Sequence, residues 1–393
     1  MNKDKIKNIL IISYLYFPSE KIGAQRWTKI GKELIKKKHN ISILSINNGE
    51  KLNDNHSFFK SKNLSKILRS NPVKFHEKFL YNFWIRVLPF FTKYNFYDLA
   101  VFDKKTIIEK AKKIIVKNDI EIVIATGAPF SLCYYNVELK MSFKNLVVIN
   151  DFRDPWTWND RYGYELISEK RKSRENKLEK KVIEKSDYIL VPVNPMKEFL
   201  VQKYPHFKDK VKIIPHFFDL NKMPKELNKS PNKKISFIYG GTIYPGTIEW
   251  YEEFSNTIFG IYDNVSISLY SQNFNKDFKS KNGLINLNKG IKEKDLLKKI
   301  SNADYYLACY PEIEKDFIST KFYQIIYLKT PIILISPKGI LSDFIKHHDL
   351  GIHILPEEIK NINKGFLRND FSFNFNVDDY ELNIVTNKLL ELM

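Results

Sequence analysis

Short apolar runs that alternate with helical patterns place the strongest limit on what this chain can fold into. The first run, NILIISYLYF at 8–17, is almost entirely aliphatic and aromatic and ends at Pro18. A run of this kind is typical of a parallel strand that is buried on both faces. Similar runs follow through the first half of the chain, at 39–46, 120–130, 145–152, 187–193 and 210–217. Because helical patterns such as 104–117 lie between them, we expect strands joined by crossover helices.

A polar stretch rich in Asn and Lys, interrupted by Pro224 and Pro231, separates this series from a second one. The apolar runs of the second series lie at 234–242, 264–271, 303–310, 330–337 and 351–355. We therefore expect an α/β fold of two tandem Rossmann-like domains that face each other across a cleft, at 1–217 and 218–375. A basic aromatic insertion is expected at about 51–100, and a last helix at 376–393 is expected to pack back on the first domain.

The composition excludes several classes of protein. With 393 residues, 43% of them hydrophobic, the chain can form two large cores and is not globally disordered. Its two cysteines, Cys133 and Cys309, are too few for a disulfide framework or a thiolate metal cage, which indicates a reducing compartment. No apolar run approaches the ~20 residues that a membrane span needs. The motifs GxGxxG, GxxxxGKS/T, GxSxG and HExxH are absent, as is an Asp-x-Asp pair, so no metal or cofactor is expected.

In the first half, unusual polar residues follow two of the predicted strands. KIGAQRW at 21–27 places Gly23 where a backbone can approach a ligand and Arg26 one turn into the next helix. NDFRDPWTWND at 150–160 packs acids and an arginine at a strand end, where an Asp can act as a base and an Arg can hold a phosphate. Two plainer readings stay open: an ordinary loop at 21–27 and a structural Asp–Arg pair at 150–160.

In the second half, two segments suit a phosphate group. YGGTIYPG at 239–246 follows a strand, and its glycines can expose backbone N–H groups beside the hydroxyl of Thr242. Ser319 and Thr320 can cap a helix and leave its N–H groups free for an anion, while Lys321 adds a full positive charge. Each feature alone also occurs in an ordinary turn or helix cap.

Together these segments resemble GT-B glycosyltransferases of the glycogen-synthase-like (family 4-like) group, in its bacterial surface-polysaccharide branch. The resemblance rests on ILIISYLYFPSEKIGAQRW, DFRDPWTWN, IIPHFFD and DFISTKFYQ, of which DFRDPW is the most specific. The acid-x7-acid pattern of the family falls on Asp316 and Gln324, so the second acid is an amide here. The family's Asn-Gly at the interdomain strand end is His216-Phe217, and TIYPGTIEW lacks the Arg and Lys that many relatives carry after GGT.

The resemblance implies a hexosyltransferase that acts with retention of configuration and without a metal on a nucleotide-sugar donor, with a UDP-sugar as the expected substrate. The implied acceptor is a glycan or a polyprenyl-diphosphate-linked glycan in capsule or O-antigen biosynthesis. Residues implied in catalysis are Asp151, Arg153, Asp154 and Asp316. Residues implied in donor binding are Gly23, Gly240, Gly241, Thr242, Ser319, Thr320, Lys321 and Gln324. On the acceptor side or in the cleft are Arg26, Trp156 and His216.

The net charge of +19 is unevenly distributed, because residues 1–200 carry 38 Lys and Arg against 22 Asp and Glu, whereas 201–393 carry 26 against 23. Residues 58–97 mix eight Lys and Arg with twelve aromatic residues. Such a stretch suits an interfacial helix on anionic inner-leaflet lipid, although its rings can instead pack in the core of the first domain. We expect a cytoplasmic protein, peripheral on the inner face of the plasma membrane. The expected membrane contacts are Lys74, Lys78, Trp84, Phe90 and Phe91.

Three other functions stay open. A sugar-nucleotide 2-epimerase of GT-B-like fold would need several carboxylates and His residues in its cleft. A non-catalytic sugar-nucleotide-binding protein is suggested by Gln324. A nucleic-acid-binding protein is suggested only by the net charge, and because no recognised binding module is present, nucleic acid is not an expected partner.

Overall fold

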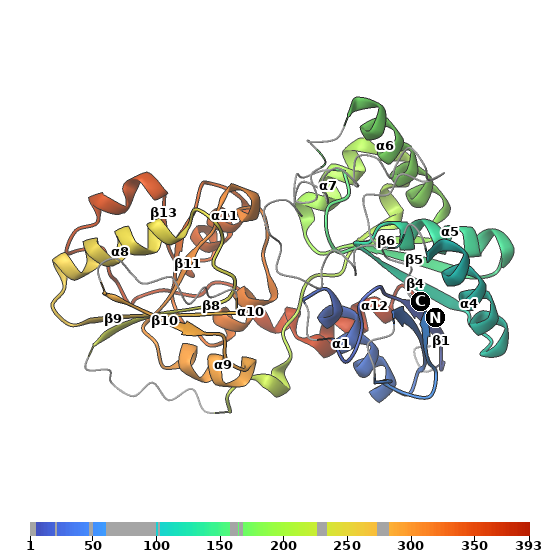
Figure 1. Ribbon diagram of the computed structural model, residues 1–393, viewed down its shortest axis with the longest axis horizontal. Helices are drawn as coiled ribbons and strands as arrows, with labels where there is room; N and C mark the ends of the chain where they lie inside the picture. The colour runs from blue at the N-terminus through green and yellow to red at the C-terminus, as the bar shows by residue number, and fades with distance from the viewer. Residues whose placement is uncertain are drawn as a thin grey trace, which may run out of the picture. The chain divides into compact units, whose positions relative to one another are not determined.

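The computed structural model describes residues 5–19, 22–46, 50–59, 100, 103–157, 164, 168–225, 234–272 and 283–393. The chain divides into two compact units, Met1–Pro215 with Val385–Met393 and His216–Ile384. We call them the first and the second unit and describe each by itself (Figure 1). The residues predicted to contact a membrane lie outside the described residues, namely Lys74, Lys78, Trp84, Phe90 and Phe91.

The first unit is built on a parallel sheet of seven strands in the order β3-β2-β1-β4-β5-β6-β7. The strands are β1 (Asn8–Ile12), β2 (Asn40–Ile46), β3 (His56–Phe59), β4 (Ile122–Gly127), β5 (Val147–Phe152), β6 (Tyr188–Val191) and β7 (Val211–Ile213). The helices are α1 (Ile22–Lys36), α4 (Lys104–Lys117), α5 (Ser131–Ser142), α6 (Glu169–Lys185) and α7 (Asn194–Lys203), and α12 (Leu382–Leu390) joins this unit from Val385 onward. Residues 9–12 of β1 are all completely buried, as expected of a strand that is covered on both faces.

Helices cover both faces of this sheet. The β1-α1-β2 crossover runs toward one edge of the sheet and the later crossovers run toward the other. Right-handed connections therefore place α1 on one face and α4 to α7 on the opposite face. On that face α4 packs beside α5, and α5 beside α6 (Figure 1). The Nζ of Lys7 donates to the carbonyl oxygen of Met393 at 3.0 Å, so the C-terminus lies beside the start of β1.

The second unit is built on a parallel sheet of six strands in the order β10-β9-β8-β11-β12-β13. The strands are β8 (Ile235–Gly240), β9 (Val265–Ser271), β10 (Ile285–Lys289), β11 (Tyr305–Cys309), β12 (Ile332–Ile335) and β13 (Gly351–Ile354). The helices are α8 (Ile248–Ile261), α9 (Glu293–Ser301), α10 (Thr320–Tyr327) and α11 (Ile340–His347). Near its C-terminal end, the N–H of Leu382 donates to the carbonyl oxygen of Phe218 at 2.9 Å.

The predicted fold class of two parallel α/β domains is confirmed, with differences in individual strands. The run at 8–17 leaves the sheet after Ile12, and the hydroxyl of Ser13 donates to the Leu15 carbonyl oxygen at 2.6 Å where the chain turns. The strand expected at 210–217 is only Val211–Ile213. Strand β10 was not predicted, because this edge strand buries only Ile285 and is otherwise largely polar. Strand β3 was not predicted either, because its four residues lie within the stretch that the sequence indicates as an aromatic insertion.

Two further observations concern the residues that the structure describes. Within them, no helix is both long enough and apolar enough to cross a bilayer. The same residues contain no group of three or more His, Cys, Asp or Glu side chains arranged to hold a metal ion.

Candidate functional site

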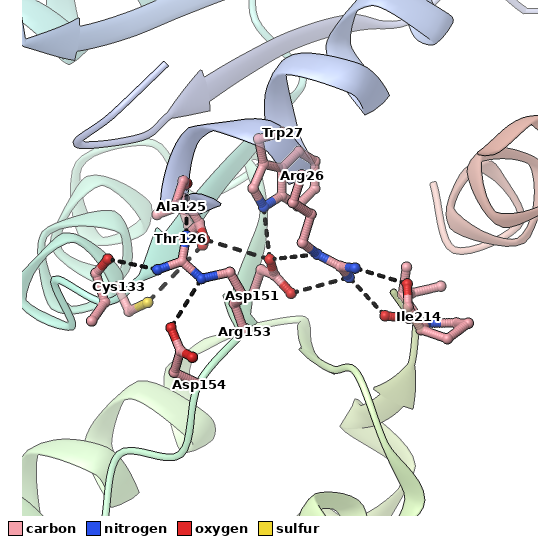
Figure 2. Close-up of polar contacts among 12 residues, drawn as sticks. Arg26, Trp27, Ala125, Thr126, Cys133, Asp151, Arg153, Asp154 and Ile214 are labelled. Atoms are coloured by element: carbon pink, nitrogen blue, oxygen red, sulfur yellow. Dashed lines mark hydrogen bonds and ion pairs between the residues drawn. The ribbon is translucent and has the colours of Figure 1, made fainter. Parts of the chain in front are cut away.

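A buried ion pair lies at the carboxyl ends of the central strands of the first unit. The Asp151 carboxylate accepts from the indole Nε1 of Trp27 at 2.7 Å and from the Nε of Arg26 at 3.1 Å (Figure 2). The Arg26 guanidinium also donates to the carbonyl oxygens of Pro215 and Ile214, at 2.8 and 2.7 Å. The pair therefore ties α1 to β5 and to the residues that follow β7.

This geometry does not support the predicted roles of Asp151 in catalysis and of Arg26 in the cleft. Asp151 is completely buried and Arg26 is 4% exposed, so neither side chain is open to a substrate. The plainer reading, a structural Asp–Arg pair, describes Asp151, but its partner is Arg26, 125 positions away. The neighbouring Arg153 is not that partner.

Arg153 instead connects the start of α1 to the segments that follow β4 and β5. Its Nη1 donates to the Gly23 carbonyl oxygen at 2.7 Å, and its Nη2 donates to the Ala128 carbonyl oxygen at 3.2 Å. Its Nε pairs with Asp154 at 3.0 Å (Figure 2). A Cβ atom on Gly23 would lie 3.3 Å from Nη1, so the glycine permits this close approach. Gly23, Arg153 and Asp154 thus form one connected group, while Asp151 belongs to the buried pair.

Trp156 is buried and belongs to the packing of the first unit. Its ring stacks on Phe130 with centroids 4.9 Å apart and planes 9° apart. Its Nε1 donates to the Glu175 carboxylate at 2.9 Å. The predicted place of Trp156 in a cleft is therefore not supported, because both its ring and its N–H are used internally.

In the second unit, a partly buried cation lies at the carboxyl end of β8. Lys321, the second residue of α10, holds its ammonium so close to Gly241 that a Cβ atom there would be 2.3 Å from Nζ. Nζ also lies 6.0 Å from the centroid of the Tyr239 ring. Burial lowers the pKa of Lys321 to about 8, and the negative charge of Glu293 opposes that shift. Lys321 is therefore a desolvated cation that an anion would stabilise.

The first turn of α10 adds further donors beside Lys321. Ser319 occupies the N-cap position, but its side chain does not cap the helix. Its hydroxyl is buried beside the Tyr310 hydroxyl and has no partner with hydrogen-bond geometry among the described residues. Because the first N–H groups of a helix lack partners within it, Ser319, Thr320 and Lys321 present donors together. The structure brings these predicted residues into one place.

A carboxylate that the sequence reading missed completes this group. Glu293, the first residue of α9, accepts from the Nε2 of Gln324 at 2.8 Å and from the Nζ of Lys222 at 2.5 Å. A carboxylate therefore faces Gln324, the amide that replaces the second acid of the predicted pattern. The segment KGIKEKD, where a helix begins shortly after a strand, could have indicated Glu293. That signal depends on β10, which was not predicted.

Gly240, which ends β8, and Gly241, which follows it, have roles that differ from the predicted one. The N–H of Gly241 donates to the Tyr270 carbonyl oxygen at 2.9 Å, so it is not exposed for a phosphate. Gly241 acts through the space that its missing side chain leaves for Lys321. A Cβ atom on Gly240 would lie 2.3 Å from Leu296, so Gly240 lets α9 pack against β8. Thr242 is exposed, and its carbonyl oxygen accepts from the Tyr239 hydroxyl at 2.7 Å.

Asp316 lies in the loop that follows β11 and contacts the start of α11. Its Oδ1 accepts from the N–H of Ile340 at 3.0 Å. Among the described residues, its second oxygen has no hydrogen-bond partner. His216, the first residue of the second unit, is half-buried. The candidate site is therefore built on Lys321, Gly241 and the first turn of α10.

Comparisons with known proteins find the fold but no close relative. No protein-family model matches this chain, and no curated protein matches its sequence. A sucrose-phosphate synthase from Thermosynechococcus elongatus has a TM-score of 0.64 at 12% identity, over 98% of each chain. A glycosyltransferase from Rickettsia africae has a TM-score of 0.63 at 16% identity, over 98% of this chain and 97% of its own. WaaG, a glycosyltransferase of lipopolysaccharide biosynthesis, has a TM-score of 0.55 at 10% identity, over 97% and 94%.

These structures span nearly the whole chain and share its pair of parallel-sheet domains. At 10 to 16% identity, the likeness establishes the fold alone. The chain therefore has the GT-B fold that its sequence predicts.

Proposed function

We propose that this protein is a glycosyltransferase whose second unit binds the diphosphate of a nucleotide-sugar donor. The observation that carries the proposal is the Lys321 ammonium, held against Gly241 at the start of α10. A partly buried cation beside the first N–H groups of a helix suits a phosphate group. The GT-B fold supports the choice of sugar transfer, because the similar solved structures include glycosyltransferases.

The chemistry follows from the charges at this site. When the bond between the anomeric carbon and the diphosphate oxygen breaks, its electron pair stays on the nucleoside diphosphate. The oxygen of the acceptor hydroxyl forms the new bond to the anomeric carbon, and its proton passes to the departing diphosphate. Lys321 and the first turn of α10 would stabilise the departing diphosphate, as donors preorganised toward developing negative charge do. We expect transfer with retention of configuration and without a metal.

The finer assignments belong to the same proposal. We take a UDP-sugar as the donor, because a UDP complex of MnaA from S. aureus has this fold, with a TM-score of 0.54 at 10% identity over 98% and 95% of the chains. The proposed acceptor is a glycan or a polyprenyl-diphosphate-linked glycan in capsule or O-antigen biosynthesis. The proposed location is the cytoplasm, peripheral on the inner face of the plasma membrane.

Calorimetric binding of UDP, GDP, dTDP and CMP tests the donor site. One nucleotide should bind the wild type, and Lys321→Ala should weaken it about thirtyfold, because a charged hydrogen bond contributes roughly 2 kcal/mol. Lys298→Ala, which removes an exposed lysine of α9, is the matched control and should change nothing. Equal binding by wild type and Lys321→Ala would overturn the assignment. Release of the nucleotide from its sugar only when an acceptor is present separates transfer from epimerisation or simple binding.

A further inference from the structure

Exposed aliphatic side chains gather at one edge of the first unit, the amino-terminal edge of its seven-stranded sheet. Val116 is 72% exposed, Met141 70%, Ile6 55% and Ile35 37%. Val116, Met141 and Ile35 lie in the last turns of α4, α5 and α1, and Ile6 lies just before β1. Helices that cross between parallel strands end at the amino-terminal edge of the sheet, so all four side chains lie at this edge.

Backbone hydrogen bonds show that the segments of this edge are neighbours. The N–H of Asn40 donates to the Lys7 carbonyl oxygen at 2.9 Å, and that of Glu121 donates to the Asn8 carbonyl oxygen at 3.0 Å. The N–H of Val147 donates to the Glu121 carbonyl oxygen at 2.9 Å. The chain before β1 and the chain after α1, α4 and α5 therefore lie side by side, with α4 packed against α5 (Figure 1).

Lysines surround these aliphatic side chains. The lysines of the edge are Lys5, Lys7, Lys36, Lys37, Lys38, Lys112, Lys113, Lys117 and Lys144. Two of the nearby acids are already paired, Glu33 with Lys36 and Glu121 with Lys5, each at 3.0 Å. The pKa of His39 is lowered by burial and by the charges of Lys7 and Lys37, which reflects the positive potential here.

The second unit provides an internal comparison. Its parallel sheet has a corresponding amino-terminal edge, formed by the ends of α8 to α11 and the starts of β8 to β13. Among the described residues, that edge exposes none of the large apolar side chains. Lysine at helix ends follows from the helix dipole alone, but exposed aliphatic side chains between those lysines do not. The combination is specific to the first unit.

We propose that this edge of the first unit binds the surface of an anionic phospholipid bilayer. The aliphatic side chains would enter the boundary between head groups and acyl chains, and the lysine ammonium groups would contact the phosphates. The chemistry favours lipid over nucleic acid, since the cations of this edge are all lysines and its exposed apolar groups are not rings that could stack on bases. None of the residues of this surface belongs to 58–97, and the proposal does not depend on the proposed transfer reaction.

Flotation of the full chain with vesicles, without a donor, tests the proposal. The wild type should float with vesicles of equal parts phosphatidylglycerol and phosphatidylcholine at low salt, and should not float with phosphatidylcholine alone. The triple variant Lys112→Gln, Lys113→Gln, Lys117→Gln should bind about a hundredfold more weakly, at roughly 1 kcal/mol per lysine near the surface. The matched control Lys170→Gln, Lys177→Gln, Lys180→Gln removes the same charge from α6 and should float like the wild type.

The aliphatic residues need a variant of their own. Val116→Ser with Met141→Ser keeps every charge and changes only exposed positions, so the fold should be unaffected. This variant should bind the same vesicles at least tenfold more weakly. If the Val116→Ser, Met141→Ser variant bound the vesicles as tightly as the wild type, the proposal would be overturned. Equal losses of vesicle binding in the α4 and α6 lysine variants would also overturn it. Wild-type binding to a single-stranded oligonucleotide in place of vesicles would also overturn it.

Discussion

The ammonium of Lys321 occupies the space where a side chain at Gly241 would begin, since a Cβ atom there would lie 2.3 Å from Nζ. The same Cβ atom would lie 2.8 Å from the Tyr239 hydroxyl. An alanine at this position would therefore displace the ammonium of Lys321 from its present place. The proposed diphosphate site depends on this relationship.

Gly241→Ala should therefore weaken nucleotide binding by displacing Lys321, with an expected loss of about tenfold or more. Calorimetric titration with the nucleotide that binds the wild type measures the loss. Gly260→Ala in α8 is the matched control, because nothing lies within 4 Å of a Cβ atom there, and it should bind normally. Normal binding by Gly241→Ala would show that Lys321 does not contact the ligand from its present position.

The lowered pKa of Lys321 predicts how binding depends on pH. Because its pKa is about 8, the free site loses its positive charge as the pH rises from 7 to 9. Nucleotide affinity should fall by up to about tenfold per pH unit above 8, with proton uptake on binding. Titrations in two buffers of different ionisation enthalpy detect that proton. Lys321→Met should remove both effects, and a flat pH profile in the wild type would contradict the prediction.

The lowered pKa of Lys321 also predicts how stability depends on pH, in the direction opposite to nucleotide affinity. Between about pH 8 and the ordinary lysine value of 10.5, the unfolded chain binds a proton at Lys321 that the folded chain does not. The contribution of this group to the free energy of unfolding should therefore rise with pH across that window. Urea unfolding of wild type and Lys321→Met at pH 7.5 and 9.5 measures it. If the stability difference between wild type and Lys321→Met fell as the pH rose, Lys321 would keep its proton in the folded protein.

Replacing Gln324 with the glutamate of the family pattern should lower the free energy of unfolding. Gln324 is buried, and its Nε2 lies 2.8 Å from the Glu293 carboxylate, so Gln324→Glu would place two carboxylates together. We expect a loss of about 1–3 kcal/mol in the free energy of unfolding, measured in urea. The double variant Gln324→Glu with Glu293→Gln restores a carboxylate–amide pair and should recover much of the loss. A gain in stability from Gln324→Glu alone would contradict the paired geometry.

The strands were predictable wherever burial is complete. The run at 8–12 is apolar at nearly every position because a central parallel strand is covered on both faces. The same rule failed for β10, where only Ile285 is buried, because an edge strand needs little apolar surface. The strand predicted from residue 8 is also too long. The residues after Ile12 form a loop that packs inside the unit, and they are apolar for that reason.

The site was predictable where its residues are neighbours in the sequence. Ser319, Thr320 and Lys321 are consecutive, so a helix start makes them converge. Glu293 reaches Gln324 across 31 positions, and no local pattern indicates that contact. The partner of Asp151 could not be predicted for the same reason, because it is the distant Arg26 and not the adjacent arginine in the motif.

The buried pair of Asp151 and Arg26 gives the last prediction. Asp151→Asn removes a charge that offsets a guanidinium only 4% exposed, so it leaves that cation uncompensated. Breaking one partner of such a pair should lower the free energy of unfolding by about 3–5 kcal/mol. Urea unfolding followed by circular dichroism measures the loss, and Asp209→Asn, at an exposed position, is the control. If Asp151→Asn kept its stability and lost only sugar transfer, Asp151 would be a catalytic base after all.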